Sequence, residues 1–162
     1  RQPELQLAKT SLGQLIKEME PQLRLLAGDR NLRLEIRSND AAVMDADKFK
    51  QVVLNLFHNA VQHTDPVRGD ITIAVQKSKN QLELLVCDNG PGIPDEHLPH
   101  IFQRFYRVDT SRTRKHGGSG LGLAITKSIV DLHKGSIHAF NLQPKGSAFS
   151  VRIPMVSGKT GD

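Results

Sequence analysis

The order of helical and extended hydrophobic patterns along the chain is the feature that most restricts its fold. Three segments carry apolar residues at helical spacing, within residues 12–26, 49–60 and 121–132. Strand-like apolar segments come in pairs between and after these helices, at residues 32–36, 42–44, 71–75, 82–87, 137–140 and 148–153. Consecutive strands between single helices are typical of an α+β two-layer sandwich rather than a doubly wound parallel sheet.

Residues at the ends of these segments fit the expected boundaries. Gly28 follows the first helical segment and Gly135 follows the third, where a glycine commonly ends a helix. Asp45 or Asp47 can cap the second helix by accepting hydrogen bonds from its first N–H groups. Pro154 ends the last strand, because proline cannot donate to a strand ladder.

The composition restricts the class of protein. A hydrophobic fraction of 38% and a charged fraction of 24% are typical of a soluble globular chain, and we expect residues 1–162 to form one domain. The apolar runs are too short to cross a bilayer. The single cysteine, Cys87, excludes an intramolecular disulfide and fits a reducing compartment such as the cytoplasm. Because the chain begins at Arg1, we expect it to be part of a longer protein.

The second helical segment carries a polar stripe beside its apolar face. Asn55, Asn59 and Gln62 fall within about 60° of one another at helical spacing. A polar stripe at the edge of a buried face can line a pocket, and an asparagine amide oxygen is a neutral hard ligand suited to Mg²⁺. The alternative interpretation is a set of surface amides without a binding role.

Residues 88–94, with the sequence Asp-Asn-Gly-Pro-Gly-Ile-Pro, directly follow a hydrophobic strand. Asn-Gly and Pro-Gly pairs encode tight turns, so an ordinary turn is one interpretation. In the other, the Asp88 carboxylate accepts a hydrogen bond from the exocyclic amine of adenine, while Gly90 and Gly92 let the backbone approach the ring. A carboxylate distinguishes adenine from guanine, because guanine presents an oxygen at that position.

A glycine-rich segment at residues 117–123 opens the third helix. Free N–H groups at a helix start can bind an anion, and no strand precedes the glycines, which excludes a dinucleotide-binding βαβ unit. Basic residues precede the segment: Arg104, Arg107, Arg112, Arg114 and Lys115. This pattern indicates a lid over phosphates, with a solvated basic loop as the alternative.

Two other patterns are given no binding role. Residues 158–160 resemble the end of a phosphate-binding P-loop, but no helix can follow them. Two histidine pairs, His58 with His63 and His97 with His100, lack a matching third metal ligand.

Taken in order, these segments resemble the ATP-binding catalytic domain of bacterial sensor histidine kinases. That domain belongs to the GHKL superfamily, together with DNA gyrase, heat-shock chaperone and mismatch-repair ATPases. The resemblance extends over about residues 12–154 and rests on an N box, a glycine box, an F box and two further glycine boxes, at residues 55–63, 88–92, 101–107, 118–123 and 146–149. It implies a Bergerat-type ATP-binding fold, in which a mixed sheet of about five strands packs on three helices and a lid covers ATP.

The resemblance also implies roles for individual residues. Asn59 would coordinate Mg²⁺ with Asn55 assisting, and Arg107 would approach the γ-phosphate, so these three form the catalytic set. Asp88 would bind the adenine amine, with support from Ser147 through a water. The residues that would hold the nucleotide are Asn59, Gln62, His63, Asp88, Gly90, Gly92, Ile93, Gly118, Ser119, Gly120, Leu121, Gly122, Leu123 and Ser147.

The chain departs from the histidine kinase pattern at two positions, and at a third it differs from the hydrolytic relatives. Gln62 stands where the family commonly has Lys or Arg, so the phosphates lose a cationic contact that Arg112 or Arg114 could replace. His63 stands where Tyr or Phe is common. The hydrolytic relatives have a Glu at the position of Asn55, and an amide cannot act as the base that activates water. This favours phosphoryl transfer over ATP hydrolysis.

The implied function is transfer of the ATP γ-phosphoryl group to a histidine on a dimerisation and phosphoacceptor domain, in two-component signalling with a response regulator. None of the seven histidines lies in the sequence context of such an acceptor. We therefore expect this chain to bind ATP as a monomer without phosphorylating itself, and the parent protein to be a homodimer. If the parent is membrane-bound, this domain lies on the cytoplasmic side.

Two alternatives remain at the level of the sequence. One is a related GHKL ATPase or serine kinase. The other is a basic nucleic-acid-binding module, suggested by the net charge of +5, although aromatic residues make up only 4% of the chain and supply few surfaces for base stacking.

Overall fold

The computed structural model describes residues 4–106 and 122–155. Its helices are α1 (Leu12–Ala27), α2 (Ala46–Gln62) and α4 (Gly122–Leu132), with a short 3-10 helix η1 (Leu98–His100). Its strands are β1 (Ala8–Ser11), β2 (Asn31–Ile36), β3 (Ala41–Met44), β4 (Asp70–Ser78), β5 (Gln81–Asp88), β6 (Ser136–Asn141) and β7 (Ser147–Pro154).

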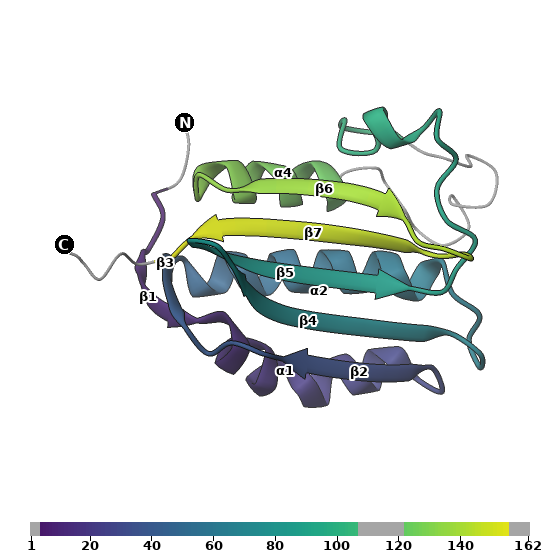
Figure 1. Cartoon of the computed structure of the whole chain (residues 1–162), viewed down its shortest axis with the longest axis horizontal. Helices are drawn as coiled ribbons and strands as arrows, with labels where there is room; N and C mark the ends of the chain where they lie inside the picture. Colours follow the sequence, from purple (N-terminus) through teal and green to yellow (C-terminus); the bar gives the residue numbers. More distant parts are fainter. Residues whose placement is uncertain (1–3, 107–121, 156–162) are drawn as a thin grey trace.

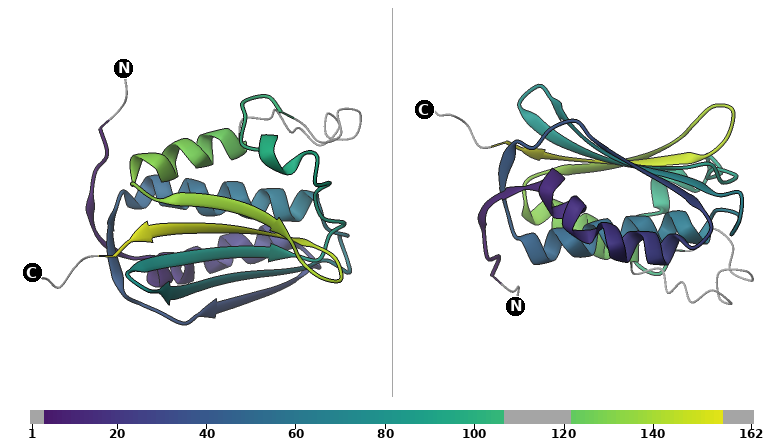
Figure 2. Two further views of the ribbon diagram at one scale, coloured as in Figure 1. Left: turned by 45° about the horizontal axis from the view of Figure 1, so that its top comes forward. Right: turned by 90° about the horizontal axis from the view of Figure 1, so that it is seen from below.

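The main sheet has five strands in the order β2-β4-β5-β7-β6 (Figure 1). Strands β2 and β4 are parallel and the other neighbours are antiparallel, so the sheet is mixed. The three α-helices cover one face of this sheet, as the right-hand view of Figure 2 shows. The α+β two-layer sandwich expected from the sequence is confirmed.

Local signals explain where the helices begin and end. The Ser11 side chain caps α1 by accepting a hydrogen bond from the N–H of Gln14, and Gly28 ends that helix with a φ of +64°. Of the two candidate caps for α2, Asp45 is the one that accepts a hydrogen bond, from the N–H of Lys48.

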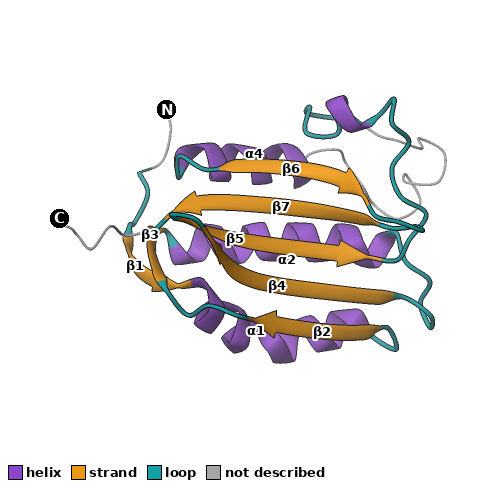
Figure 3. Ribbon diagram, in the orientation of Figure 1, coloured by secondary structure: helices purple, strands orange, loops and turns teal. Residues whose placement is uncertain are grey.

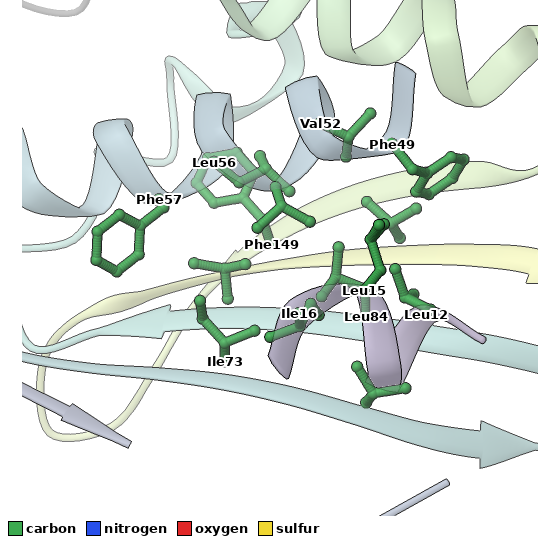
Figure 4. Close-up of a cluster of buried hydrophobic side chains, with 14 of the residues drawn as sticks. Leu12, Leu15, Ile16, Phe49, Val52, Leu56, Phe57, Ile73, Leu84 and Phe149 are labelled. Atoms are coloured by element: carbon green, nitrogen blue, oxygen red, sulfur yellow. The ribbon is translucent and has the colours of Figure 1, made fainter. Parts of the chain in front are cut away.

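The hydrophobic core lies between the sheet and the helices (Figure 4). The α2 side chains Phe49, Leu56 and Phe57 are fully buried there, and Phe149 of β7 meets them from the sheet. Because α2 contributes an unbroken apolar stripe to this core, the polar stripe beside it is held in a fixed direction.

The sequence patterns missed one strand. The expected strand at residues 42–44 exists as β3, but it pairs antiparallel with β1 in a separate two-stranded sheet. Strand β1 has the sequence Ala-Lys-Thr-Ser, which carries no apolar alternation, and two of its four residues are exposed. It forms through its backbone pairing with β3, which periodicity cannot reveal.

The prediction for the apolar face of α4 was wrong in part. Ile125 and Leu132 belong to the apolar spacing that predicts a helix within residues 121–132, but they are 39% and 38% exposed. The buried positions are Ala124, Thr126, Ile129 and Val130. Thr126 lies in this face because its hydroxyl donates to the carbonyl oxygen of Gly122 and accepts from Asn55, so a polar residue occupies a buried position that an apolar count overlooks.

Within the described part of the chain, no helix has the length and hydrophobicity needed to span a bilayer.

Candidate functional site

The predicted site residues that the structure describes gather at one end of the sandwich. Helix α2, strand β5 and strand β6 finish at this end, and β7 and α4 begin there, on the right of Figures 1 and 3. Residues that are far apart in the sequence therefore meet, and each is placed by an element that is anchored in the core.

Asp88, the last residue of β5, is only 4% exposed. Its Oδ1 accepts a hydrogen bond from the N–H of Gly90 at 2.8 Å, and its Oδ2 accepts one from the hydroxyl of Ser147 at 2.9 Å. No described basic side chain forms an ion pair with this carboxylate. Each carboxylate oxygen can accept a further hydrogen bond, so Asp88 retains capacity for a ligand.

The contact between Ser147 and Asp88 corrects one expectation. The sequence suggested support through a water, but the hydroxyl of Ser147 donates directly to the carboxylate. The reason is strand register, since Ser147 of β7 is the pairing partner of Asp88 in β5. Paired side chains on one face lie close enough for a direct hydrogen bond.

Two glycines allow the backbone to close around Asp88. A Cβ at Gly90 would lie 2.2 Å from the carbonyl oxygen of His63, so α2 ends directly against the residues that follow β5. At Gly146, φ is +110° and a Cβ would lie 2.1 Å from the carbonyl oxygen of Asp88. Any other residue at either position would push the surrounding backbone away from the carboxylate.

Helix α2 places Asn59 one turn before this contact. His63 caps the helix, and its N–H donates to the carbonyl oxygen of Asn59 at 3.2 Å. The His63 ring is partly buried, and burial lowers its pKa although the negative charge of Asp88 acts in the opposite direction. This places the carboxylate of β5 and the polar stripe of α2 at the same end of the molecule, as a shared site requires.

The asparagines of the stripe differ in their partners. The Nδ2 of Asn59 is buried and has no hydrogen-bond partner among the described residues. The Nδ2 of Asn55 donates to the carbonyl oxygen of Gly122 at 3.3 Å and to the hydroxyl of Thr126 at 3.2 Å. Gln62 is exposed. A buried amide without a partner costs free energy that a bound ligand can offset.

These observations fit a nucleotide and its metal ion. The Asp88 carboxylate can accept from a base amine, and the unpartnered Nδ2 of Asn59 can donate to a ligand oxygen. The amide oxygen on the same side chain is of the neutral kind that suits Mg²⁺. Ile93 is buried beside the site, and Leu123 of α4 is half-buried against the core. Gly92 follows Gly90 with a φ of +86°.

Several predicted site residues lie outside the described residues, and their roles stay predictions. They are Arg107, Gly118, Ser119, Gly120 and Leu121, together with the lid residues Arg112, Arg114 and Lys115. Residues 158–160 are also outside the described part of the chain. Gly122 is described, and its carbonyl oxygen accepts from both Asn55 and Thr126.

Sequence reasoning missed Asn141, which lies at the end of β6. Its side chain makes hydrogen bonds of 2.8 and 2.7 Å to the backbone N–H and C=O of Ile93. It also missed Arg30, which holds the end of α2 through the carbonyl oxygens of Val61 and Thr64 and the hydroxyl of Thr64. Only the register of β6 against β7 could have indicated Asn141.

A hollow lies at the opposite end of the sandwich from these residues. It is lined by Leu7, Val43, Leu132, His133, Lys134, Pro154 and Met155. Both ring nitrogens of His133 are already used, since Nδ1 donates to the carbonyl oxygen of Ile129 and Nε2 accepts from the N–H of Asp45. Across the described ranges, no three His, Cys, Asp or Glu side chains lie close enough to hold a metal ion.

Residues 44–157 match the family described as histidine kinase-, DNA gyrase B-, and HSP90-like ATPase. The chain is 43% identical over 131 residues to the sensor protein CiaH of Streptococcus pneumoniae, an alignment that covers 80% of this chain and 29% of CiaH. The curated relatives are much longer than this chain. It spans only 10% of a hybrid histidine kinase that it matches over 159 residues.

Solved structures give the same relationship. The mycobacterial sensor histidine kinase MprB superposes with a TM-score of 0.82 at 27% identity, covering 91% of this chain and 98% of that one. The histidine kinase ThkA, in complex with the response regulator protein TrrA, superposes with a TM-score of 0.74 at 27% identity. That match covers 95% of this chain and 43% of ThkA.

Proposed function

The chain belongs to the family of histidine kinase-, DNA gyrase B- and HSP90-like ATPases, and from this premise we propose that it is the ATP-binding catalytic domain of a two-component histidine kinase. It binds Mg-ATP at the Asp88 end of the sheet. In the parent protein it transfers the γ-phosphoryl group to a histidine on a phosphoacceptor domain.

The observation that carries this proposal is the state of the Asp88 carboxylate. It is buried, it is oriented by Ser147 and Gly90, and it has no cationic partner among the described side chains. Taking a carboxylate out of water without a cation is unfavourable, so such a group is expected where a ligand donor completes its surroundings. The adenine amine is a donor of the right kind.

We assign the metal end of the site to helix α2. Asn59 binds Mg²⁺ through its amide oxygen, and Asn55 assists from the preceding turn. A Mg²⁺ ion held by these amides would neutralise charge on the phosphates. Ser119 and the neighbouring glycines hold the phosphate chain, and Arg107 approaches the γ-phosphate.

We infer phosphoryl transfer rather than hydrolysis from the chemistry of Asn55. Its amide donates hydrogen bonds to Gly122 and Thr126 and cannot take a proton from water. A neutral histidine nitrogen on the acceptor is already nucleophilic, so positioning and charge neutralisation suffice for transfer.

The partners follow from the same proposal. Residues 1–162 form a single ATP-binding domain that is monomeric alone and works in a homodimeric parent on the cytoplasmic side. The acceptor is a helical hairpin of the same or the partner subunit. A response regulator then receives the phosphoryl group, in line with the complex of the neighbour ThkA with TrrA.

The transfer is tested with radiolabelled ATP, using the chain alone and mixed with an isolated histidine-kinase acceptor hairpin. We expect label on the hairpin and none on this chain, because it carries no acceptor histidine. Strong self-labelling would contradict the proposal. Fast phosphate release without an acceptor would instead identify an ATPase, and label on serine would identify a serine kinase.

The metal role is tested by calorimetric titration of ATP with and without Mg²⁺. In Asn59→Ala we expect the gain in affinity that Mg²⁺ provides to be lost. Asn80→Ala is the matched control, because Asn80 is an exposed asparagine of the β4–β5 turn and should leave that gain unchanged. An unchanged Mg²⁺ effect in Asn59→Ala would remove Asn59 from the metal site.

A further inference from the structure

Asn141 lies in one row with Asp88 and Ser147. Ser147 pairs with Asp88 of β5 on one side and with Asn141 of β6 on the other. Directly opposed residues in a sheet point to the same face, so three neighbouring strands present three polar side chains side by side. The first two form the carboxylate end of the proposed nucleotide site.

The third member of the row is hydrogen-bonded to the segment that follows Asp88. The Oδ1 of Asn141 accepts from the N–H of Ile93 at 2.8 Å, and its Nδ2 donates to the carbonyl oxygen of Ile93 at 2.7 Å. Strand β6 is an edge strand of the sheet. In an antiparallel sheet, a residue on the neighbouring strand would accept from the N–H of Ile93 and donate to its C=O. Here the side-chain amide of Asn141 makes both of these hydrogen bonds instead.

The backbone around Ile93 has few other means of support. Pro91 and Pro94 have no N–H to donate, and Gly92 has a φ of +86°. Among the described residues, Asn141 is the hydrogen-bond partner of both the N–H and the C=O of Ile93. The side chain of Ile93 is 6% exposed, so its depth in the site follows from where Asn141 holds its backbone.

The turn between β6 and β7 ties Asn141 to the carboxylate as well. The N–H of Leu142 donates to the carbonyl oxygen of Gly146 at 2.9 Å, which closes this turn. Gly146 then lies directly against the carbonyl oxygen of Asp88. The β6–β7 hairpin therefore contacts the chain on both sides of Gly90 and Gly92. Gly146 contacts Asp88, and Asn141 contacts Ile93.

We propose that Asn141 is a positioning residue of the nucleotide site, which holds Ile93 at the depth where it meets the purine ring. The inference rests on the proposed function, because it assumes that Asp88 binds an adenine and that the buried Ile93 contacts its ring. Asn141 acts through Ile93. Its loss should weaken binding of the base and leave binding of the phosphates unchanged.

The test compares three ligands by calorimetry: ADP, adenosine and inorganic tripolyphosphate. In Asn141→Ala we expect about tenfold weaker binding of both ADP and adenosine, with tripolyphosphate unchanged. The inference would be overturned if Asn141→Ala bound ADP and adenosine as tightly as the unaltered chain binds them. A loss confined to tripolyphosphate would overturn it too.

Hydrogen exchange reports on the contact itself without any ligand. The amide of Ile93 should exchange faster in Asn141→Ala, because its acceptor is removed. Asn141→Asp keeps an acceptor oxygen for that amide and loses only the donor to the Ile93 carbonyl, so exchange should stay slow. Equal exchange rates in Asn141→Ala and the unaltered chain would show that these hydrogen bonds do not hold Ile93.

Two controls separate positioning from a general loss of stability. Asn80→Ala makes the same chemical change in an exposed turn, and Ile16→Val removes one buried methyl group from α1. We expect Ile16→Val to lower the unfolding midpoint without changing either affinity. If the unaltered chain binds neither ADP nor adenosine, the proposed function fails together with this inference. Binding by the unaltered chain and equally by Asn141→Ala overturns the inference alone.

Discussion

Strand β5 carries two buried carboxylates whose surroundings differ. Glu83 and Asp88 are 5% and 4% exposed, and each accepts a hydrogen bond from a serine of β7. They lie on opposite faces, because Leu82, Leu84 and Val86 share the helix-covered face with Asp88. The two groups therefore have the same chemistry and nearly the same exposure, and can be compared directly.

The difference lies in how far each carboxylate is satisfied by the chain. Glu83 accepts from the hydroxyl of Ser150 at 2.6 Å, from the amide of Gln76 at 2.9 Å and from the guanidinium of Arg152 at 3.1 Å. Burial alone would raise the pKa of Glu83, but these hydrogen bonds and the charge of Arg152 outweigh it and lower that pKa. Asp88 has a serine and one backbone N–H.

The comparison teaches that burial of a carboxylate does not by itself identify a binding site. Glu83 uses its capacity to hold three strands in register, and no ligand is needed to balance its charge. Asp88 lies at the end of its strand with capacity left over. If this distinction is correct, equivalent substitutions at the two positions should affect different properties of the protein.

The largest effect is expected on nucleotide affinity when Asp88 is changed. Asp88→Asn should weaken ADP binding by about a hundredfold. If the amide nitrogen faces the base, it presents a donor to the adenine amine; if it faces Ser147, the hydrogen bond from that hydroxyl is lost. The matched change Glu83→Gln should leave the affinity unaltered. Calorimetric titration of both variants measures this, and equal affinities would remove the distinction between the two carboxylates.

The next effect is on stability, and the roles reverse. Glu83→Gln should lower the free energy of unfolding by about 2 kcal/mol, since it loses the charge that Ser150, Gln76 and Arg152 stabilise. Asp88→Asn should cost little. A group with a lowered pKa contributes stability that is lost as the pH falls through that pKa. The penalty in Glu83→Gln should therefore shrink in acid, which urea denaturation at several pH values can test.

A smaller pair of effects is expected at the two serines. Ser147→Ala should weaken ADP binding by about fivefold, because one hydrogen bond that orients Asp88 is removed. Ser150→Ala should lower stability and leave the affinity intact. Measuring both properties in both variants sharpens the comparison. The idea fails if Ser150→Ala weakens binding as much as Ser147→Ala.

The smallest effect is a pH dependence at His63. Burial lowers the pKa of its ring, so the unfolded chain takes up a proton more readily than the folded one. The free energy of unfolding should therefore fall as the pH drops below the ordinary histidine pKa of about 6.5. His63→Tyr should remove part of that decline, by a few degrees of melting temperature. An identical decline in the variant would contradict the buried position of the ring.

The layer architecture could be predicted from the sequence because each main element carries its own periodic signal. The stripe that includes Phe49, Leu56 and Phe57 indicates α2, and its register alone places Asn55 and Asn59 beside the core. The cap was ambiguous between Asp45 and Asp47, since either could precede a first turn. Strand β1 could not be predicted, because its pairing with β3 leaves no pattern in Ala-Lys-Thr-Ser.

The site was predictable only where it is local. Asp88 and the glycines after it form one short segment, so their grouping is visible in the sequence. The direct hydrogen bond from Ser147 joins residues 59 positions apart, and the two between Asn141 and Ile93 join residues 48 apart. Both depend on strand register, which no short pattern specifies. Thr126 was overlooked because polar residues buried with partners resemble exposed ones in a sequence.

The turn that joins β6 to β7 has a consequence for variation of the chain's length. Side chains alternate between the faces of a strand, so deleting a single residue between Leu142 and Gly146 would shift β6 by one position. Asn141 would then point to the opposite face, even though every side chain of the purine end was still present. The number of residues in this hairpin is therefore as much a part of ligand recognition as their identity.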